Sequence, residues 1–311
     1  MTTENMNTHE FYRSVSGLLD PRSIQTKRVA VAGLGSGGGR VAAELGRLGV
    51  NLLLIERPEE RLEEHNILRH VLGYRSLGKS KILEMLEYIR NLNPSTHVES
   101  CPLDVVEHQE TLEKQLKLWR PDVLAVCTDN EPSKHALNEV AFNLGIPQTG
   151  GAVYDRGVGG EVYRTSPGQA CYGCLASHLS LERYAPRSRD DNYNNSTEDS
   201  QTQSICALNL DIQQIALLQC RMTLQLLLGT TWDELRVPGE VNLCVFANRV
   251  VPGTFARAWH CDFYSVVRQK DCLTCGQGCA GFERDADRIV AELKKSSSMS
   301  SSSCELKLAK R

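Results

Sequence analysis

One group of residues in this chain has the spacing of a nucleotide-binding turn. Gly33, Gly35 and Gly38 form a GxGxxG pattern that follows a short apolar run and precedes a helical pattern. Glycine at such a turn lets the backbone approach a phosphate, and the start of the helix offers free N–H groups and the positive end of its dipole. An acid at the tip of the next strand, here Glu56, commonly binds ribose hydroxyls. The pattern indicates a nucleotide site, with a simple tight turn as the alternative, and does not separate a dinucleotide from ATP.

A second group of charged residues makes that distinction. Arg69 follows the second strand, Lys81 opens the next helix, and Asp129 comes directly after the fourth strand. Hydride transfer has no need of these charges. In nucleotidyl transfer, cations neutralise the charge that develops on the phosphates and a carboxylate holds Mg²⁺. Each residue alone is more often a solvated charge, but together they fall at the carboxyl edge of one sheet, where such folds bind ligands. The set favours an enzyme that cleaves ATP.

The elements that must position these residues follow from hydrophobic periodicity. The segment 80–92 has apolar residues at i, i+3, i+4 and i+7, which predicts a helix, whereas 51–56 is a short apolar run typical of a buried strand. By the same criteria we predict strands over 28–32, 51–56, 97–101 and 122–127, and helices over 10–19, 38–48, 80–92, 109–119 and 132–144. Strands that alternate with helices indicate βαβ units and a parallel, Rossmann-like sheet.

The pattern changes after residue 150. Short strands predicted over 161–164, 241–246 and 254–259 suggest an antiparallel extension of the sheet. A long polar loop over 183–204 leads into an apolar helix over 208–228. The serine-rich tail from residue 294 cannot form a core, and we expect it to be disordered.

Composition narrows the class of protein. The 311 residues are 41% hydrophobic, which allows one large α/β domain, and the net charge of −3 gives no basic field for nucleic acid or a membrane surface. No apolar run approaches the roughly 20 residues of a membrane span, and the polar N-terminus lacks a secretory signal. We therefore expect a cytoplasmic protein that binds neither membranes nor nucleic acid.

Twelve cysteines in a reducing compartment suggest metal ligands and reactive thiols. Four of them form two CxxC pairs with a glycine in or beside each turn: Cys171, Cys174, Cys272 and Cys275. Four thiolates at this spacing can close a tetrahedral, structural Zn²⁺ site. A redox pair at a helix start is the alternative, and Cys279 could replace one ligand.

Cys206 is the candidate nucleophile. It lies where the polar loop over 183–205 meets the helix that begins near Leu208, so the helix dipole would stabilise its thiolate. The alternative is a small apolar residue packed at a helix start. We expect Cys127, in an apolar strand, and Cys220, inside a helix, to be small core residues.

The motifs GLGSGGG, EEHNILRH, GKSK, CTDNEPSKHALN and PGQACYGC together resemble the ThiF/MoeB/HesA family, the prokaryotic relatives of ubiquitin-activating enzymes. The resemblance extends over about residues 10–280. It implies ATP and Mg²⁺ as cofactors, adenylation of the C-terminal glycine of a ubiquitin-like protein with release of pyrophosphate, a structural Zn²⁺ held by separated CxxC pairs, and a homodimer.

The resemblance also implies residue roles. Asn66 and Arg69 would contact the triphosphate, Lys81 the transferring phosphate and Asp129 the metal. An N-terminal arginine, either Arg13 or Arg22, would reach into the site of the partner subunit.

The loop before Cys206 resembles the crossover loop that carries the thioester cysteine of ubiquitin-activating enzymes. The loop and the chain length also resemble stand-alone bacterial activating enzymes of ubiquitin-like antiviral defence operons. Two departures concern the nucleotide contacts: the usual Asp-x-Asp after the second strand is replaced by the segment 56–60, with acids at Glu56 and Glu60, and His65 stands where serine is commoner.

These observations predict an α/β ThiF-type fold in five parts. They are an N-terminal lead-in (1–27), an adenylation core (28–182), a crossover loop (183–206), a C-terminal part with the second CxxC (207–285), and a terminal helix with a tail (286–311). We expect adenylation, thioester formation on Cys206 and transfer to a conjugating enzyme.

Three alternatives stay open. The first is adenylation without a thioester, for sulfur transfer in thiamine or molybdopterin synthesis. The second is adenylation of a tRNA nucleoside, which the absence of a basic face disfavours. The third is a nucleotide-binding regulator or an NAD-dependent oxidoreductase.

Overall fold

The structure is a computed structural model, and it describes residues 8–179, 206–229 and 238–276. Its strands form one eight-stranded sheet in the order β3-β2-β1-β4-β5-β6-β7-β8. The strands are β1 Arg28–Ala32, β2 Asn51–Glu56, β3 Val98–Pro102, β4 Val123–Val126, β5 Gln148–Val153, β6 Gly159–Thr165, β7 Leu243–Ala247 and β8 His260–Tyr264. The α-helices are α1 Thr8–Phe11, α2 Pro21–Ile24, α3 Ser36–Arg47, α4 Lys81–Leu92, α5 Gln109–Trp119, α6 Glu131–Leu144, α7 Tyr172–Leu179 and α8 Asn209–Leu228.

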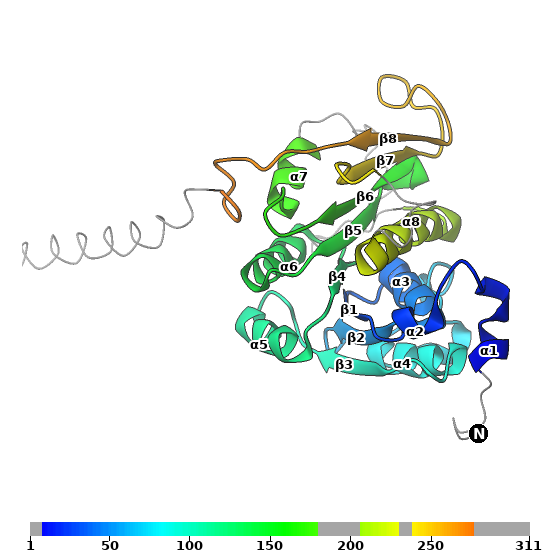
Figure 1. The fold of residues 1–311 in the computed structure, drawn as a ribbon. Helices are drawn as coiled ribbons and strands as arrows, with labels where there is room; N and C mark the ends of the chain where they lie inside the picture. The colour runs from blue at the N-terminus through cyan, green and yellow to red at the C-terminus, as the bar shows by residue number, and fades with distance from the viewer. Residues whose placement is uncertain (1–7, 180–205, 230–237, 277–311) are drawn as a thin grey trace, which may run out of the picture.

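Strands β1 to β5 pair in parallel and form the first half of the sheet. Alternate residues of the central strands enter two different cores, because side chains of a strand point to opposite faces. Val29 and Val31 pack with α3, α4 and α8, whereas Ala30 and Ala32 pack with α5 and α6. Figure 1 shows these two groups of helices on opposite sides of the sheet. The predicted Rossmann-like α/β architecture is confirmed for this half.

Strands β5 to β8 pair antiparallel and continue the same sheet, as predicted. Helix α8 packs on one face of this half, through Ile215 and Met222, and α7 packs on the other, through Tyr172 and Leu175. The sequence prediction missed both β5 and α7. The β5 segment QTGGAV contains two glycines and one polar end, which hides its strand character.

Two predicted elements differ from the structure. Over the range 10–19, where one helix is predicted, the structure has the end of α1 and a 3₁₀ turn at Arg13–Val15. Gly17, at a φ of +85°, cannot continue a helix. The last strand is β8, and not the segment 254–259, which follows a turn with Gly253 at a φ of +79°. Trp259 at a φ of +53° ends that turn region directly before β8.

Most of the predicted crossover loop, the serine-rich tail and Cys279 lie outside the described residues. Within the described part of the chain, no helix has the length and apolar character needed to cross a bilayer.

Candidate active site

The three glycines of the GxGxxG turn are required for different reasons. A Cβ on Gly33, which has a φ of +88°, would lie 2.9 Å from the backbone of Cys127 and Thr128, and a Cβ on Gly38 would lie 1.9 Å from the carbonyl oxygen of Gly33. These two glycines therefore allow β1, the turn, α3 and the end of β4 to pack closely. A Cβ on Gly35 would meet no atom within 4 Å, so this residue faces the open space in which a phosphate could lie.

Glu56, at the tip of β2, is bonded to the glycine turn. Its Oε2 accepts a hydrogen bond of 2.7 Å from the N–H of Leu34, and its Oε1 accepts one of 3.0 Å from the N–H of Arg57. Burial raises the pKa of Glu56, and these backbone donors partly oppose that rise. The Glu56 side chain thus fixes the conformation of the glycine turn at Leu34. Its contact with ribose remains a prediction.

Lys81, the first residue of α4, lies beside an acid that the sequence left without a role. Its Nζ is 2.6 Å from Oε2 of Glu60, and the Lys81 side chain is only 12% exposed. Arg57 donates to the same carboxylate. Burial works against ionisation of Glu60, but the hydrogen bond and charge of Lys81, together with those of Arg57, lower its pKa. The lowered pKa favours the anionic form of Glu60, which anchors Lys81.

The loop between β2 and α4 carries Asn66 and Arg69. Asn66 Oδ1 accepts a hydrogen bond of 3.1 Å from the N–H of Glu63, which closes a 3₁₀ turn at Glu64–Asn66. Arg69 is half-buried, and its N–H donates to the carbonyl of Asn66 at 2.9 Å. The next residue, His70, is buried and contacts the glycine turn, which sequence reasoning missed. The signal in the sequence that could have pointed to His70 is its position directly after Arg69.

Asp129 is exposed just beyond the carboxyl end of β4. Cys127, the residue after β4, donates its N–H to the carbonyl of Ala32 at 2.8 Å, and Ala32 is the last residue of β1 before the glycine turn. Asn130 follows as the cap of α6, and its side chain accepts from the N–H of Ser133 at 2.9 Å. Because β2, β1 and β4 are parallel neighbours, the turn, Glu56 and Asp129 lie along one edge of the sheet.

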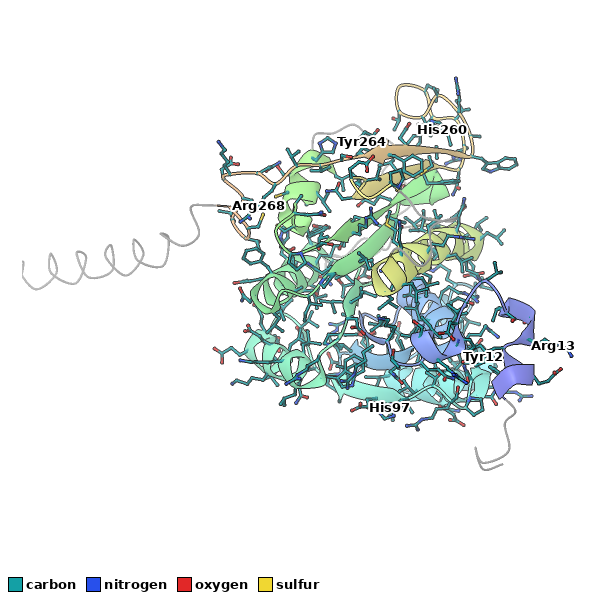
Figure 2. All side chains as sticks on the ribbon, in the orientation of Figure 1. Tyr12, Arg13, His97, His260, Tyr264 and Arg268 are labelled. Atoms are coloured by element: carbon teal, nitrogen blue, oxygen red, sulfur yellow. The ribbon has the colours of Figure 1, made fainter. Side chains whose placement is uncertain are left out.

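Arg13 lies at the opposite edge of the sheet. Its neighbour Tyr12 donates to the carbonyl of Leu48 at 3.3 Å and accepts from Asn93, and these two residues follow the ends of α3 and α4. The Arg13 side chain is 71% exposed and lies 2.9 Å from Glu10. Figure 2 shows it at the outer margin of the molecule. The structure therefore does not bring Arg13 to the nucleotide edge of its own chain, and α2, which carries Arg22, is also part of this N-terminal region.

Cys206 is exposed ahead of α8. Its N–H donates to Oδ1 of Asp155 at 3.3 Å. Asp211, in the first turn of α8, accepts from the N–H of Leu208 at 3.1 Å and from Asn248 at 3.1 Å. These bonds fix the start of α8 against the β5–β6 and β7–β8 connections.

The first turn of α8 also lies on the glycine turn. Cγ2 of Ile212 is 3.9 Å from the position of a Cβ on Gly37, the second residue of α3. The first turn of α8, which begins three residues after Cys206, therefore lies against the start of α3. A shallow cleft of about 300 Å³ opens beside Asp155, lined also by Arg156, Val158 and residues 249–252.

The two CxxC pairs converge on one point. The four sulfur atoms of Cys171, Cys174, Cys272 and Cys275 all lie within 4.8 Å of one another. The sulfurs of Cys171 and Cys272 are 3.5 Å apart, and those of Cys174 and Cys275 are 3.4 Å apart, both far longer than a disulfide bond. A tetrahedral Zn²⁺ site with Zn–S bonds of about 2.3 Å has sulfurs roughly 3.8 Å apart.

The cluster fits Zn²⁺ better than a redox pair. The first pair does lie at a helix start, because α7 begins at Tyr172. However, four converging sulfurs leave no single exposed, reactive pair. Burial works against ionisation of Cys272, but backbone donors from Cys275 and Thr274 lower its pKa to about 7, which favours the thiolate that a metal needs.

Comparisons with known proteins identify the family of this chain. Residues 12–249 match the ThiF family. A sulfur carrier protein adenylyltransferase of Thermus thermophilus is 33% identical over 162 residues, which cover 48% of this chain and 56% of that protein. Ubiquitin-like modifier-activating enzyme 5 of Mus musculus is 29% identical over 164 residues, which cover 50% of this chain and 40% of that protein. The chain thus spans about half the length of the curated relatives it matches.

Among solved structures, E. coli MccB with ATP superposes with a TM-score of 0.59 at 16% identity, covering 82% of this chain and 68% of that one. At this identity the likeness concerns the fold alone. The family match covers most of the chain, from Tyr12 in the N-terminal region to Arg249 after β7. This chain belongs to the ThiF family.

Proposed function

We propose that this protein uses ATP and Mg²⁺ to adenylate the C-terminal carboxylate of a small ubiquitin-like protein that ends in glycine, and then takes the acyl group onto Cys206. The observation that carries the proposal is the packing of Ile212, in the first turn of α8, on the glycine turn at Gly37. This contact supports the proposal, because α8 begins three residues after Cys206, which carries the exposed thiol. A conjugating enzyme would accept the acyl group from Cys206.

In the first step, an oxygen of the acyl carboxylate attacks the α-phosphorus of ATP, and pyrophosphate leaves with the electron pair of the broken P–O bond. Gly35 would present its backbone to the phosphates, and Arg69 and Lys81 would balance the charge that develops on them. Asn66 would add a polar contact to the triphosphate, and Asp129 is the carboxylate that would hold Mg²⁺ together with the phosphates.

In the second step, the Cys206 thiolate attacks the carbonyl carbon of the acyl adenylate and AMP leaves, so that a thioester replaces the mixed anhydride. Exposure of Cys206, three residues ahead of the 20-residue helix α8, lets the thiol meet the adenylate. The start of α8 is held by Asp211 and Asn248, which keeps the segment near the turn.

The experiment is a conjugation assay on non-reducing gels, with ATP and a ubiquitin-like protein that ends in glycine. The wild type should form a conjugate that thiol reductant dissolves. Cys206→Ser should give a conjugate that resists reductant, because an oxygen ester replaces the thioester, and Cys206→Ala should give none. Cys101→Ser, a half-buried cysteine of β3, is the matched control and should behave as the wild type. A reductant-sensitive conjugate on Cys206→Ala would exclude this residue.

A second candidate is adenylation of a sulfur carrier without a thioester on the enzyme. It is favoured by the relative from Thermus thermophilus, which is named a sulfur carrier protein adenylyltransferase. In this case Cys206→Ala would keep full pyrophosphate release, and no enzyme-bound conjugate would form with the wild type. The conjugation assay therefore separates the two candidates.

We also propose a homodimer in which Arg13 or Arg22 of one copy completes the site of the other. The support is the position of Arg13, which is exposed and lies at the edge of the sheet opposite its own glycine turn. Mixing an Arg13→Ala chain with an Asp129→Ala chain should restore one active site per dimer. No restored activity with either arginine variant would contradict a site shared between subunits.

A further inference from the structure

His70 makes two hydrogen bonds of different kinds. Its Nδ1 accepts from the N–H of Leu72 at 3.0 Å, and its Nε2 lies 2.8 Å from the carbonyl oxygen of Leu34. An N–H directed at Nδ1 requires that this nitrogen carry no proton, and a carbonyl oxygen only accepts. The proton of a neutral His70 therefore sits on Nε2, and His70 donates to the glycine turn.

The surroundings keep His70 in this neutral form. The residue is 6% exposed, and its burial lowers the pKa of the ring. The charge of Lys81 acts in the same direction, while the bond to Leu34 acts against it. The ring also packs on the first turn of α3, since a Cβ on Gly39 would lie 3.1 Å from Nε2.

The bond to Leu34 fixes the direction of a neighbouring N–H group. The carbonyl of Leu34 and the N–H of Gly35 belong to one planar trans peptide, so they point in opposite directions. Because the carbonyl of Leu34 is directed at His70, the N–H of Gly35 points away from the ring. A Cβ on Gly35 would meet no atom within 4 Å, so the space beside this residue is open. Glu56 fixes the N–H group of Leu34, because its Oε2 accepts from that group at 2.7 Å.

We infer that His70 is a positioning residue for nucleotide binding: it clamps the peptide between Leu34 and Gly35 so that the Gly35 N–H is aimed at a phosphate of ATP. The inference rests on the proposed nucleotide site and adds to it a residue that touches no substrate. It links the loop of Asn66 and Arg69 to the glycine turn through one hydrogen bond.

Two conservative variants separate this role from a merely local one. In His70→Gln the amide nitrogen can take the place of Nε2 and keep the bond to Leu34, but the acceptor for Leu72 is lost. In His70→Asn the amide oxygen can take the place of Nδ1 and keep the bond to Leu72, but the side chain is too short to reach Leu34. Each variant loses one hydrogen bond of the protein.

The measurement is the Kd for ATP of the full chain by calorimetry, with the unfolding temperature of each variant recorded beside it. His70→Gln should bind ATP within about threefold of the wild type. His70→Asn should bind about tenfold more weakly, the effect of one misdirected hydrogen bond, although both variants lose similar stability. The same pair of substitutions at the exposed His97 is the matched control and should leave the Kd unchanged.

A second measurement uses the wild type alone. In protein labelled with ¹⁵N-glycine, the amide resonance of Gly35 should shift on addition of ATP. The inference is overturned if that resonance does not move, if His70→Asn binds ATP as well as His70→Gln, or if the two variants lose affinity equally. A wild type that binds no ATP at all would instead contradict the proposed function.

Discussion

The Nζ of Lys81 lies 2.6 Å from Oε2 of Glu60, so the ammonium group proposed for the transferring phosphate is held by a carboxylate four residues beyond β2. This relationship joins two segments that are separate in sequence, the end of β2 and the start of α4. It also gives the ammonium group, on a side chain that is only 12% exposed, an anionic partner.

The pair makes stability depend on pH in a defined direction. The pKa of Glu60 is lowered in the folded protein, so its contribution is fully present above the ordinary glutamate pKa of about 4.3 and is lost as pH falls through the lowered value. Above pH 5, Glu60→Gln should lower the free energy of unfolding by roughly 1–2 kcal/mol, between the values for exposed and buried pairs.

Denaturant unfolding of the wild type and Glu60→Gln, from pH 3 to pH 7, checks this prediction. The difference between the two proteins should shrink as pH falls below about 4. Glu59→Gln, at an exposed neighbour, is the control and should change little at any pH. A difference that stays constant over the whole range would show that the pair contributes through packing alone.

Gly35 and Gly38 should respond differently to the same substitution. Gly35→Ala adds a methyl group to open space at a φ of −67°, so the protein should keep its stability but bind ATP at least tenfold more weakly. Gly38→Ala forces a Cβ against the carbonyl of Gly33, so it should destabilise the fold by about 2 kcal/mol or more. Thermal unfolding and ATP calorimetry on both variants measure the two effects. Equal loss of stability would contradict the distinction.

The cysteine cluster should bind one Zn²⁺ per chain, detectable by elemental analysis of the purified protein. Cys272→Ser should reduce the zinc content and lower the unfolding temperature by about 10 °C, since metal-binding energy is folding energy. Cys261→Ser, at a half-buried cysteine of β8 outside the cluster, is the control for the loss of a thiol. Wild-type protein without zinc, or with a disulfide inside the cluster, would exclude the structural metal site.

The sequence allowed the parallel half of the fold to be predicted because its signals are local. Strands such as β2 are continuous apolar runs, and helices such as α4 have a regular apolar period. The predictions failed where backbone conformation decides the outcome. Gly17, at positive φ, lies inside the segment predicted as a helix, and Gly253, also at positive φ, directly precedes the segment predicted as a strand.

The candidate site shows the same limit. Glycines, charged residues and paired cysteines are visible as residue types, so Gly35, Lys81 and the CxxC pairs could be selected from their spacing. The roles of Glu60 and His70 depend on contacts between segments, at distances that only the fold defines. The sequence could not show that Ile212 meets Gly37, because the two residues are 175 positions apart in the chain.

The central claim is that the edge of the sheet carrying Gly35, Lys81 and Asp129 catalyses adenylation of an acyl carboxylate. Its most direct test is exchange of labelled pyrophosphate into ATP, measured with a ubiquitin-like protein that ends in glycine. We predict exchange that requires the free C-terminal carboxylate, falls by a factor of about 100 or more in Asp129→Ala and Lys81→Met, and persists in Cys206→Ala. Exchange that is unchanged in Asp129→Ala and Lys81→Met, or that is absent in the wild type with every ubiquitin-like protein ending in glycine that is tested, would contradict the account.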